Sequence, residues 1–157
     1  MPYKLDEIDK RILRTLQHNG RIQNVDLADE VGLSPSPCLR RVRLLEEAGV
    51  IDRYVAVLDP AKIGLKMTFF ARVWLKAQDA ETTDAFIEAV RKMPEVVEAY
   101  IMLGDCDAML RVVAADLEDF RRFQTKHLSR INGVQNVKTD VPSEATNCRC
   151  AEKFDAG

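Results

Sequence analysis

The sequence predicts an α+β protein of two domains, an N-terminal winged helix-turn-helix followed by a ferredoxin-like domain of βαββαβ order. Three observations predict this fold class. Apolar residues recur at the i, i+3, i+4 spacing of helices through residues 5–47. From about residue 66 onward, stretches of strand-like alternation and of helical period follow one another. Two units of this second part share the order strand, helix, Pro or Gly break, strand.

The first two helices end at glycines. An apolar stripe predicts a helix over residues 5–16, and Asn19-Gly20 ends it. Asn24 is a suitable N-cap for a short second helix. Gly32 ends that helix and permits a sharp turn into the next one.

The third helix has Ser34 as N-cap and Pro35 at the first helical position, where the missing N–H costs nothing. At 100° per residue, its apolar and polar residues separate onto two sides. Cys38, Val42 and Leu45 share one side, and the opposite side holds Ser36, Arg40, Arg43 and Glu47. Residues 50–58 then indicate a short β-hairpin or an extended arm. This order is that of a winged helix-turn-helix.

The second domain alternates strands and helices. The expected elements are a strand over 68–77, a helix over 82–93, strands over 97–103 and 110–114, a helix over 116–131 and a last strand from Val134. This split-βαβ order leaves one face of a four-stranded sheet without helices. We therefore divide the chain into a helix-turn-helix domain (1–60), a ferredoxin-like domain (61–141) and a tail (142–157).

The open face of that sheet predicts an oligomer. Its residues should be those out of phase with the side that packs on the helices, including Phe70, Trp74, Tyr100, Met102, Met109 and Val113. These side chains are too large and apolar for comfortable exposure, and a domain of this size is marginally stable alone. We expect a homodimer at least.

Composition excludes several classes of function. The 157 residues hold 23 Lys plus Arg against 25 Asp plus Glu, a net charge of −2, which argues against coating nucleic acid or membrane by bulk charge. No apolar run approaches the roughly 20 residues that span a bilayer, and no signal peptide is recognisable. We expect a cytoplasmic protein without a membrane partner.

The cysteines and histidines do not indicate a metal or catalytic site. Cys38, Cys106, Cys148 and Cys150 show neither paired zinc-ligand spacing nor a disulfide framework. His18 and His127 fall in predicted helices, without a Cys or Ser at a telling spacing. We expect no enzyme activity, no metal and no cofactor.

The third helix carries the clearest functional signal. Arg40 and Arg43 lie one turn apart on its outer side, with Ser36 near its start, and a guanidinium fork there can reach guanine O6 and N7 in a major groove. Arg41 points about 100° away, toward a phosphate or an internal pair with Glu. A plain solvated face balanced by Glu46 and Glu47 is the alternative, which the helix-turn-helix frame disfavours. Arg21 and Asn24, at the start of the second helix, offer phosphate contacts.

These motifs resemble the Lrp/AsnC (feast/famine) family of transcriptional regulators. The matching runs are Leu5-Asp6-x-x-Asp9-x-x-Ile12-Leu13, Asn24-x-x-Leu27-Ala28-x-x-Val31-Gly32-Leu33-Ser34-Pro35-Ser36-Pro37-Cys38-x-Arg40-Arg41-Val42, Leu45-Glu46-x-x-Gly49-Val50-Ile51 and Gly104-Asp105-Cys106-Asp107-x-x-Leu110-Arg111-Val112-Val113. The resemblance implies sequence-specific binding to double-stranded DNA, control of amino-acid metabolism or transport genes, dimers through the sheet domain and assembly to octamers. The expected DNA-contacting residues are Arg21, Asn24, Ser34, Ser36, Pro37, Arg40, Arg41 and Arg43.

The resemblance also implies a small-molecule effector, an amino acid bound between dimers near the turn after residue 103. Gly104 would give the backbone approach, and Asp107 would hold the ligand's ammonium, as a zwitterion requires. The expected effector residues are Tyr100, Met102, Gly104, Asp105, Cys106 and Asp107. A plain hairpin turn is the alternative reading of this segment.

The sequence departs from the family pattern in two places. Cys106 occupies a position that is often aromatic, which would widen the pocket or alter its effector. The tail from Pro142 through Cys148 and Cys150 lacks the usual ending, on which octamer contacts partly depend. A metabolite-binding module or enzyme built on the second domain, and a regulator without an effector, are the competing functional hypotheses.

Overall fold

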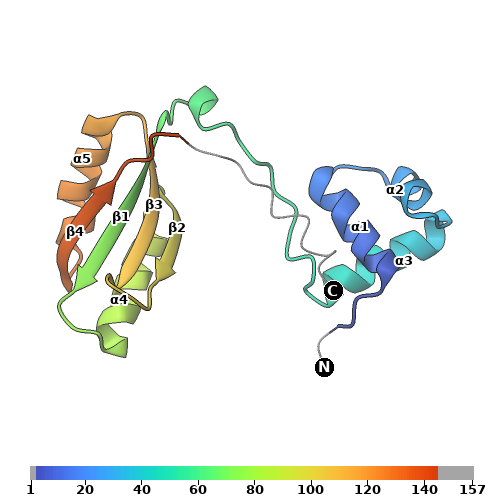
Figure 1. Cartoon of the computed structure of the whole chain (residues 1–157), viewed down its shortest axis with the longest axis horizontal. Helices are drawn as coiled ribbons and strands as arrows, with labels where there is room; N and C mark the ends of the chain where they lie inside the picture. The colour runs from blue at the N-terminus through green and yellow to red at the C-terminus, as the bar shows by residue number, and fades with distance from the viewer. Residues whose placement is uncertain (1–2, 145–157) are drawn as a thin grey trace. The chain divides into compact units, whose positions relative to one another are not determined.

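The computed structural model describes residues 3–144, and it divides into two compact units with the boundary between Val57 and Leu58 (Figure 1). The first unit is helical and the second is built on a β-sheet. Among the helices of residues 3–144, none combines the length and the apolar character that crossing a bilayer requires. Cys148 and Cys150, and most of the predicted tail, lie outside the described residues.

The helical unit contains α1 (Glu7–His18), α2 (Asn24–Val31) and α3 (Pro35–Glu47). A capping box starts α1: the Asp6 side chain accepts from the backbone N–H of Asp9, and the Asp9 side chain accepts from that of Asp6. The buried core of the unit consists of Ile12, Leu13, Leu27, Ala28, Val31, Cys38 and Leu45. The apolar sides predicted for the first and third helices therefore meet in this core, together with the apolar side of α2.

The connection between α2 and α3 is tight. Gly32 ends α2 with φ of +75°, a conformation that other residues adopt only with strain. Ser34 and Pro35 occupy the N-cap and the first position of α3, as predicted. The prediction for Asn24 was wrong by one position: Gln23 is the N-cap of α2, and the Asn24 Nδ2 donates instead to the Pro35 carbonyl at 2.8 Å. This bond fastens the start of α2 to the start of α3.

After α3 the chain runs as an extended arm. Of the two alternatives for residues 50–58, the structure shows the arm, since no strand occurs among residues 3–57. The Tyr54 hydroxyl donates to the Glu46 Oε1 at 2.9 Å and ties the arm to α3. Burial and this carboxylate raise the pKa of Tyr54 to about 12.

The second unit has the predicted βαββαβ order. Its elements are a short 3₁₀ turn η1 (Ala61–Ile63), β1 (Met67–Leu75), α4 (Ala80–Arg91), β2 (Val96–Ile101), β3 (Ala108–Ala114), α5 (Leu117–Lys126), a second 3₁₀ turn η2 (Leu128–Arg130) and β4 (Val134–Asp140). The strands form one antiparallel sheet in the order β2-β3-β1-β4. The ferredoxin-like fold class is confirmed.

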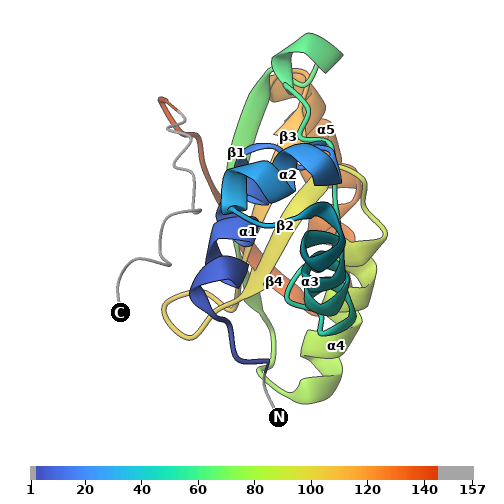
Figure 2. The ribbon, with the colours of Figure 1, turned by 90° about the vertical axis from the view of Figure 1, so that its right-hand side faces the viewer.

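Both helices of this unit cover the same face of the sheet (Figure 2). Phe86 of α4 and Phe120 and Phe123 of α5 are buried against alternate residues of β1 and β3. The rings of Phe69 and Phe120 stack with centroids 4.0 Å apart. The alternation read from the sequence thus selected the residues that form this core.

The other face is less apolar than predicted. Phe70, Trp74, Met109 and Val113 lie on it, as expected from the register. Cross-strand ion pairs lie among them and join Arg72 to Asp140 and Arg111 to Glu98. Met102 is not a strand residue, because β2 ends at Ile101.

Candidate DNA-binding face and ligand pocket

The outer side of α3 presents Ser36, Arg40 and Arg43 to solvent. The three side chains line one shallow depression, so the predicted clustering on the side opposite Cys38 and Leu45 is present in the structure. Within residues 3–144 neither Arg40 nor Arg43 pairs with a carboxylate. Two guanidinium groups one turn apart are therefore open to a ligand.

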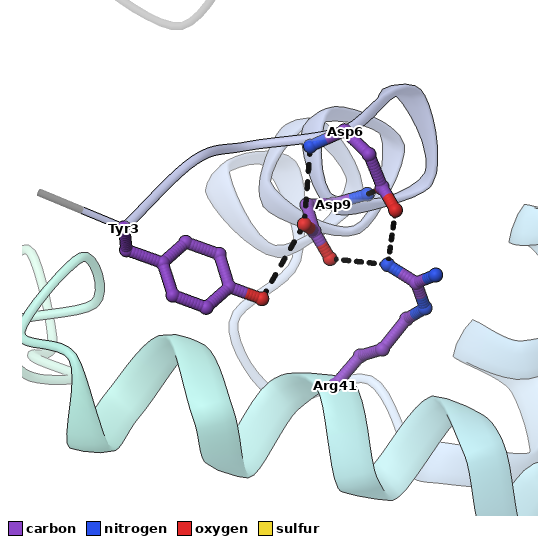
Figure 3. A network of polar contacts seen from close by, with 4 residues as sticks. All are labelled: Tyr3, Asp6, Asp9 and Arg41. Atoms are coloured by element: carbon purple, nitrogen blue, oxygen red, sulfur yellow. Dashed lines mark hydrogen bonds and ion pairs between the residues drawn. The ribbon is translucent and has the colours of Figure 1, made fainter.

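Arg41, on the same helix, is already engaged in ion pairs within the chain. Its Nη1 lies 2.7 Å from the Asp6 Oδ2 and 2.8 Å from the Asp9 Oδ1, both at the start of α1 (Figure 3). The Tyr3 hydroxyl donates to the other oxygen of Asp9 at 3.4 Å. The sequence anticipated an internal pair for Arg41 with a glutamate, whereas the partners are two aspartates from another helix.

The burial of this network makes it a strong link between α1 and α3. Asp9 is only 1% exposed and ranks among the largest fully buried side chains of the chain, although it is an acid. The backbone N–H of Asp9 and then the Arg41 guanidinium lower the pKa of Asp6. The same carboxylates raise the pKa of Arg41. A buried carboxylate requires a partner of this kind, because an unpaired charge in the interior is costly.

The other expected DNA-contacting residues stand around α3 and α2. Arg21, Ser34 and Pro37 are exposed, and Asn24 is half-buried. The Ser34 side chain accepts no capping hydrogen bond, so its hydroxyl stays available to another group. The N–H groups at the start of a helix attract phosphate oxygens, and α2 begins at Asn24.

A second depression, of about 290 Å³, lies where β2 ends, on the helix side of the sheet. Its lining residues are Leu75, Gln78, Thr83, Ile101, Met102, Leu103, Gly104 and Asp107. Three of the six expected effector residues, Met102, Gly104 and Asp107, are among them. The sequence did not identify Gln78, which lies between β1 and α4 among residues without a periodic signal, or Thr83, a polar residue near the start of α4.

The remaining three expected effector residues lie elsewhere. Tyr100 faces Met109 on the open face and donates to the Glu98 Oε2 at 3.1 Å. Cys106 is buried, at 5% exposure. The Asp105 carbonyl accepts from the Trp74 Nε1 at 2.6 Å. Within this single chain, these three residues do not line the depression.

Asp107 fastens the turn to the end of β1. Its Oδ2 accepts from the Leu75 N–H at 2.7 Å, and its Oδ1 accepts from the Gln78 Nε2 at 2.7 Å. A carboxylate has about four acceptor sites, so two remain open. The backbone N–H groups of Leu103 and Gly104 donate to no group within the described part of the chain. Acceptor and donor capacity thus lie side by side at one turn.

Comparison with known families decides the identity. The family model for "Winged helix-turn-helix DNA-binding" domains matches residues 5–52, and the family model for the "Lrp/AsnC ligand binding domain" matches residues 68–149. The chain belongs to the Lrp/AsnC family. It is therefore a transcriptional regulator with a DNA-binding helix-turn-helix domain and a ligand-binding domain, as the sequence predicts.

Relatives of this Lrp/AsnC chain share most of its length. It is 44% identical to the leucine-responsive regulatory protein of Rhizobium meliloti over 87% of both chains. It is 39% identical to the transcriptional regulator AzlB of Bacillus subtilis over 90% of both. Among solved structures, a transcriptional regulator of Neisseria meningitidis in complex with L-methionine has a TM-score of 0.92 at 34% identity, covering 98% of this chain and 99% of that one. An AsnC family regulator of Agrobacterium tumefaciens has a TM-score of 0.87 at 38% identity, covering 93% and 95%.

Proposed function

We propose that this Lrp/AsnC regulator binds operator DNA through the outer side of α3 and responds to an apolar amino acid bound at the β2–β3 turn. DNA binding is supported by the guanidinium groups of Arg40 and Arg43, unpaired within residues 3–144, on the exposed side of α3, which is the second helix of the helix-turn-helix formed by α2 and α3. In this geometry Arg40 and Arg43 reach base edges, and each bidentate contact to guanine contributes ~1–3 kcal/mol of discrimination. Such a regulator works where the chromosome is, in the cytoplasm.

The remaining contacts position the protein on the DNA. Arg21, Asn24, Ser34 and Pro37 face the phosphates, where they set register without reading sequence. Ser36 adds a hydroxyl beside the two arginines. Arg41 holds α3 against α1 through Asp6 and Asp9, and this fixes the helix whose outer side reads the bases.

The test is selection of bound fragments from sheared genomic DNA, followed by gel-shift titration. Arg40→Ala with Arg43→Ala should abolish site-specific binding while the fold, measured by circular dichroism, is unchanged. Arg91→Ala with Lys92→Ala removes the same charge from α4 and its C-cap and should leave the affinity as it is. Unchanged binding by the α3 variant would refute the proposed role of α3.

An amino acid fits the second site by charge and by shape. The two open acceptor sites of Asp107 suit an ammonium group, and the free N–H groups of Leu103 and Gly104 suit a carboxylate. Leu75, Ile101 and Met102 favour an apolar side chain. The L-methionine bound to the Neisseria regulator, and the leucine in the names of several relatives, support this class of effector.

A thermal-shift screen of the twenty amino acids tests the effector, with L-methionine and L-leucine first. A ligand at 100 times its dissociation constant stabilises its partner by ~2.7 kcal/mol. Asp107→Asn should remove the shift, whereas Asp84→Asn on the exposed side of α4 should retain it. No shift with any amino acid would indicate a regulator without an amino-acid effector.

The open sheet face supports a homodimer. Phe70, Trp74 and Met109 are only half-buried in the single chain, and a second copy would cover them. Further association of dimers into octamers follows the family pattern, and sedimentation velocity measures both steps.

A further inference from the structure

The outer side of α5 carries a second group of cations, far along the chain from the helix-turn-helix. Phe120 and Phe123 bury the inner side of the helix against the sheet. Arg121, Arg122 and Lys126 are exposed, and together they line one shallow depression. We call these three residues the α5 strip.

The α5 strip differs from three arginines of the sheet unit in having no acidic partner. Arg72, Arg91 and Arg111 each pair with a carboxylate at 2.7–2.9 Å. Within residues 3–144 no carboxylate pairs with any member of the strip. Glu118, one turn before both arginines, is exposed and joined to neither.

Asp116 and Asp119, near the start of α5, accept hydrogen bonds from backbone N–H groups there. The Asp116 side chain accepts from the Asp119 N–H at 2.8 Å, and the Asp119 side chain accepts from the Ala115 N–H at 3.1 Å. Favourable interaction with the helix dipole explains a cation in the last turn, where Lys126 stands. It does not explain Arg121 and Arg122, which lie in the middle of the helix. Neither helix capping nor the helix dipole therefore accounts for these two cations.

We propose that the α5 strip is a second, sequence-independent contact with the phosphate backbone of DNA. The proposal rests on the proposed DNA-binding function. With a net charge of −2 the chain does not attract DNA as a whole, so any added attraction must come from a local concentration of cations such as this one. From Arg121 to Lys126 the helix rises ~7.5 Å. That length faces roughly two phosphates of one DNA strand, which are spaced ~3.4 Å along the axis.

The experiment measures the salt dependence of binding to a random-sequence duplex long enough to contact both units. Full-length protein is titrated at several salt concentrations, with Arg121→Gln, Arg122→Gln and Lys126→Gln combined in one variant. Glutamine keeps helix propensity, and thermal unfolding verifies the fold. Each lost phosphate contact lowers the slope of log K against log salt by ~0.9, so we expect the slope to decrease by about 2 for each strip engaged.

A matched control separates local contact from net charge. Lys62→Gln, Lys76→Gln and Lys92→Gln remove the same charge from exposed positions of the same unit, and this variant should keep the wild-type slope. An equal decrease in both variants, or no decrease in the α5 variant, overturns the proposal. The second result would leave an acidic protein surface as the partner of the strip. The Arg40→Ala, Arg43→Ala variant distinguishes the two proposals: wild-type affinity there refutes α3 as the DNA reader, whatever the α5 variant does.

Discussion

Replacing Arg41 with methionine should destabilise the helical unit by about 3 kcal/mol. The substitution keeps the aliphatic stem but leaves the Asp9 carboxylate, at 1% exposure, without its cationic partner. Removing one member of a buried pair costs ~3–5 kcal/mol. Arg41 is itself 29% exposed, and Asp9 still accepts from the Asp6 N–H at 3.2 Å, so the lower end applies. Loss of the ion pair between Arg41 and Asp6 adds little to this cost, because exposed pairs contribute ~0–1 kcal/mol.

A double-mutant cycle isolates the buried contact. In an Asp9→Ala background, Arg41→Met loses only its exposed pair with Asp6 and should cost less than ~1 kcal/mol, leaving a coupling energy of about 2 kcal/mol. Amide hydrogen exchange of α1 and α3 in the full-length chain measures the opening free energy of this unit alone. Arg53→Met is the control, because its pair with Asp52 is 73% and 78% exposed and should contribute almost nothing.

One result would refute this reasoning. If Arg41→Met left the opening free energy of α3, measured by hydrogen exchange, within about 0.5 kcal/mol of wild type, the ion pairs of Arg41 would not anchor the helix. Simultaneous loss of DNA binding would then assign Arg41 to a phosphate contact. If Arg41 is an anchor, binding measured well below the unfolding temperature should weaken equally for all DNA sequences, and the base preferences selected by Arg40 and Arg43 should not change.

Three other substitutions test separate parts of the structure. Gly133→Ala should destabilise the sheet unit by ~1–3 kcal/mol in denaturant titration, because φ is +95° and the new Cβ would stand 2.8 Å from the Thr82 Cγ2; wild-type stability would contradict that geometry. The raised pKa of Tyr54 adds stability that is fully present below pH 10 and lost as pH rises toward 12; Tyr54→Phe should remove this dependence, and an unchanged alkaline profile would exclude the Glu46 contact as its cause. Phe70→Glu on the open face should convert a dimer to a folded 17.8 kDa monomer in sedimentation, and a persistent dimer would place the interface elsewhere.

The local elements were predictable because short-range chemistry decides them. Pro35 begins α3 where a missing N–H has no cost, and Gly32 supplies the left-handed turn before it. The spacing of apolar residues along the sequence was enough to predict which residues of β1 and α3 are buried. Asn24 was misjudged because its amide finds a better partner in the Pro35 carbonyl, eleven residues along the chain, than in its own helix.

The candidate sites were predictable only in part. Arg40 and Arg43 share an exposed side because helix geometry alone requires it. Arg41 is the same residue type on the same helix, and its different role comes from an ion pair with Asp9, which lies 32 positions away in the sequence. At the β2–β3 turn, the motif located Asp107, yet the Gln78 and Leu75 groups that it binds come from another strand and its following loop. No pattern within a single segment contains these pairings.

By itself, the sequence determined the order of elements and the side of α3 that faces solvent, since helical and strand periods and turn residues act over a few positions. Tertiary structure alone decided which charges are satisfied. Asp9 pairs with Arg41, the Asp107 carboxylate accepts from the backbone N–H at the end of β1, and neither Arg121 nor Arg122 pairs with a carboxylate within residues 3–144. Ion pairs form between atoms a few ångströms apart, and in these cases that proximity results from the packing of distant segments.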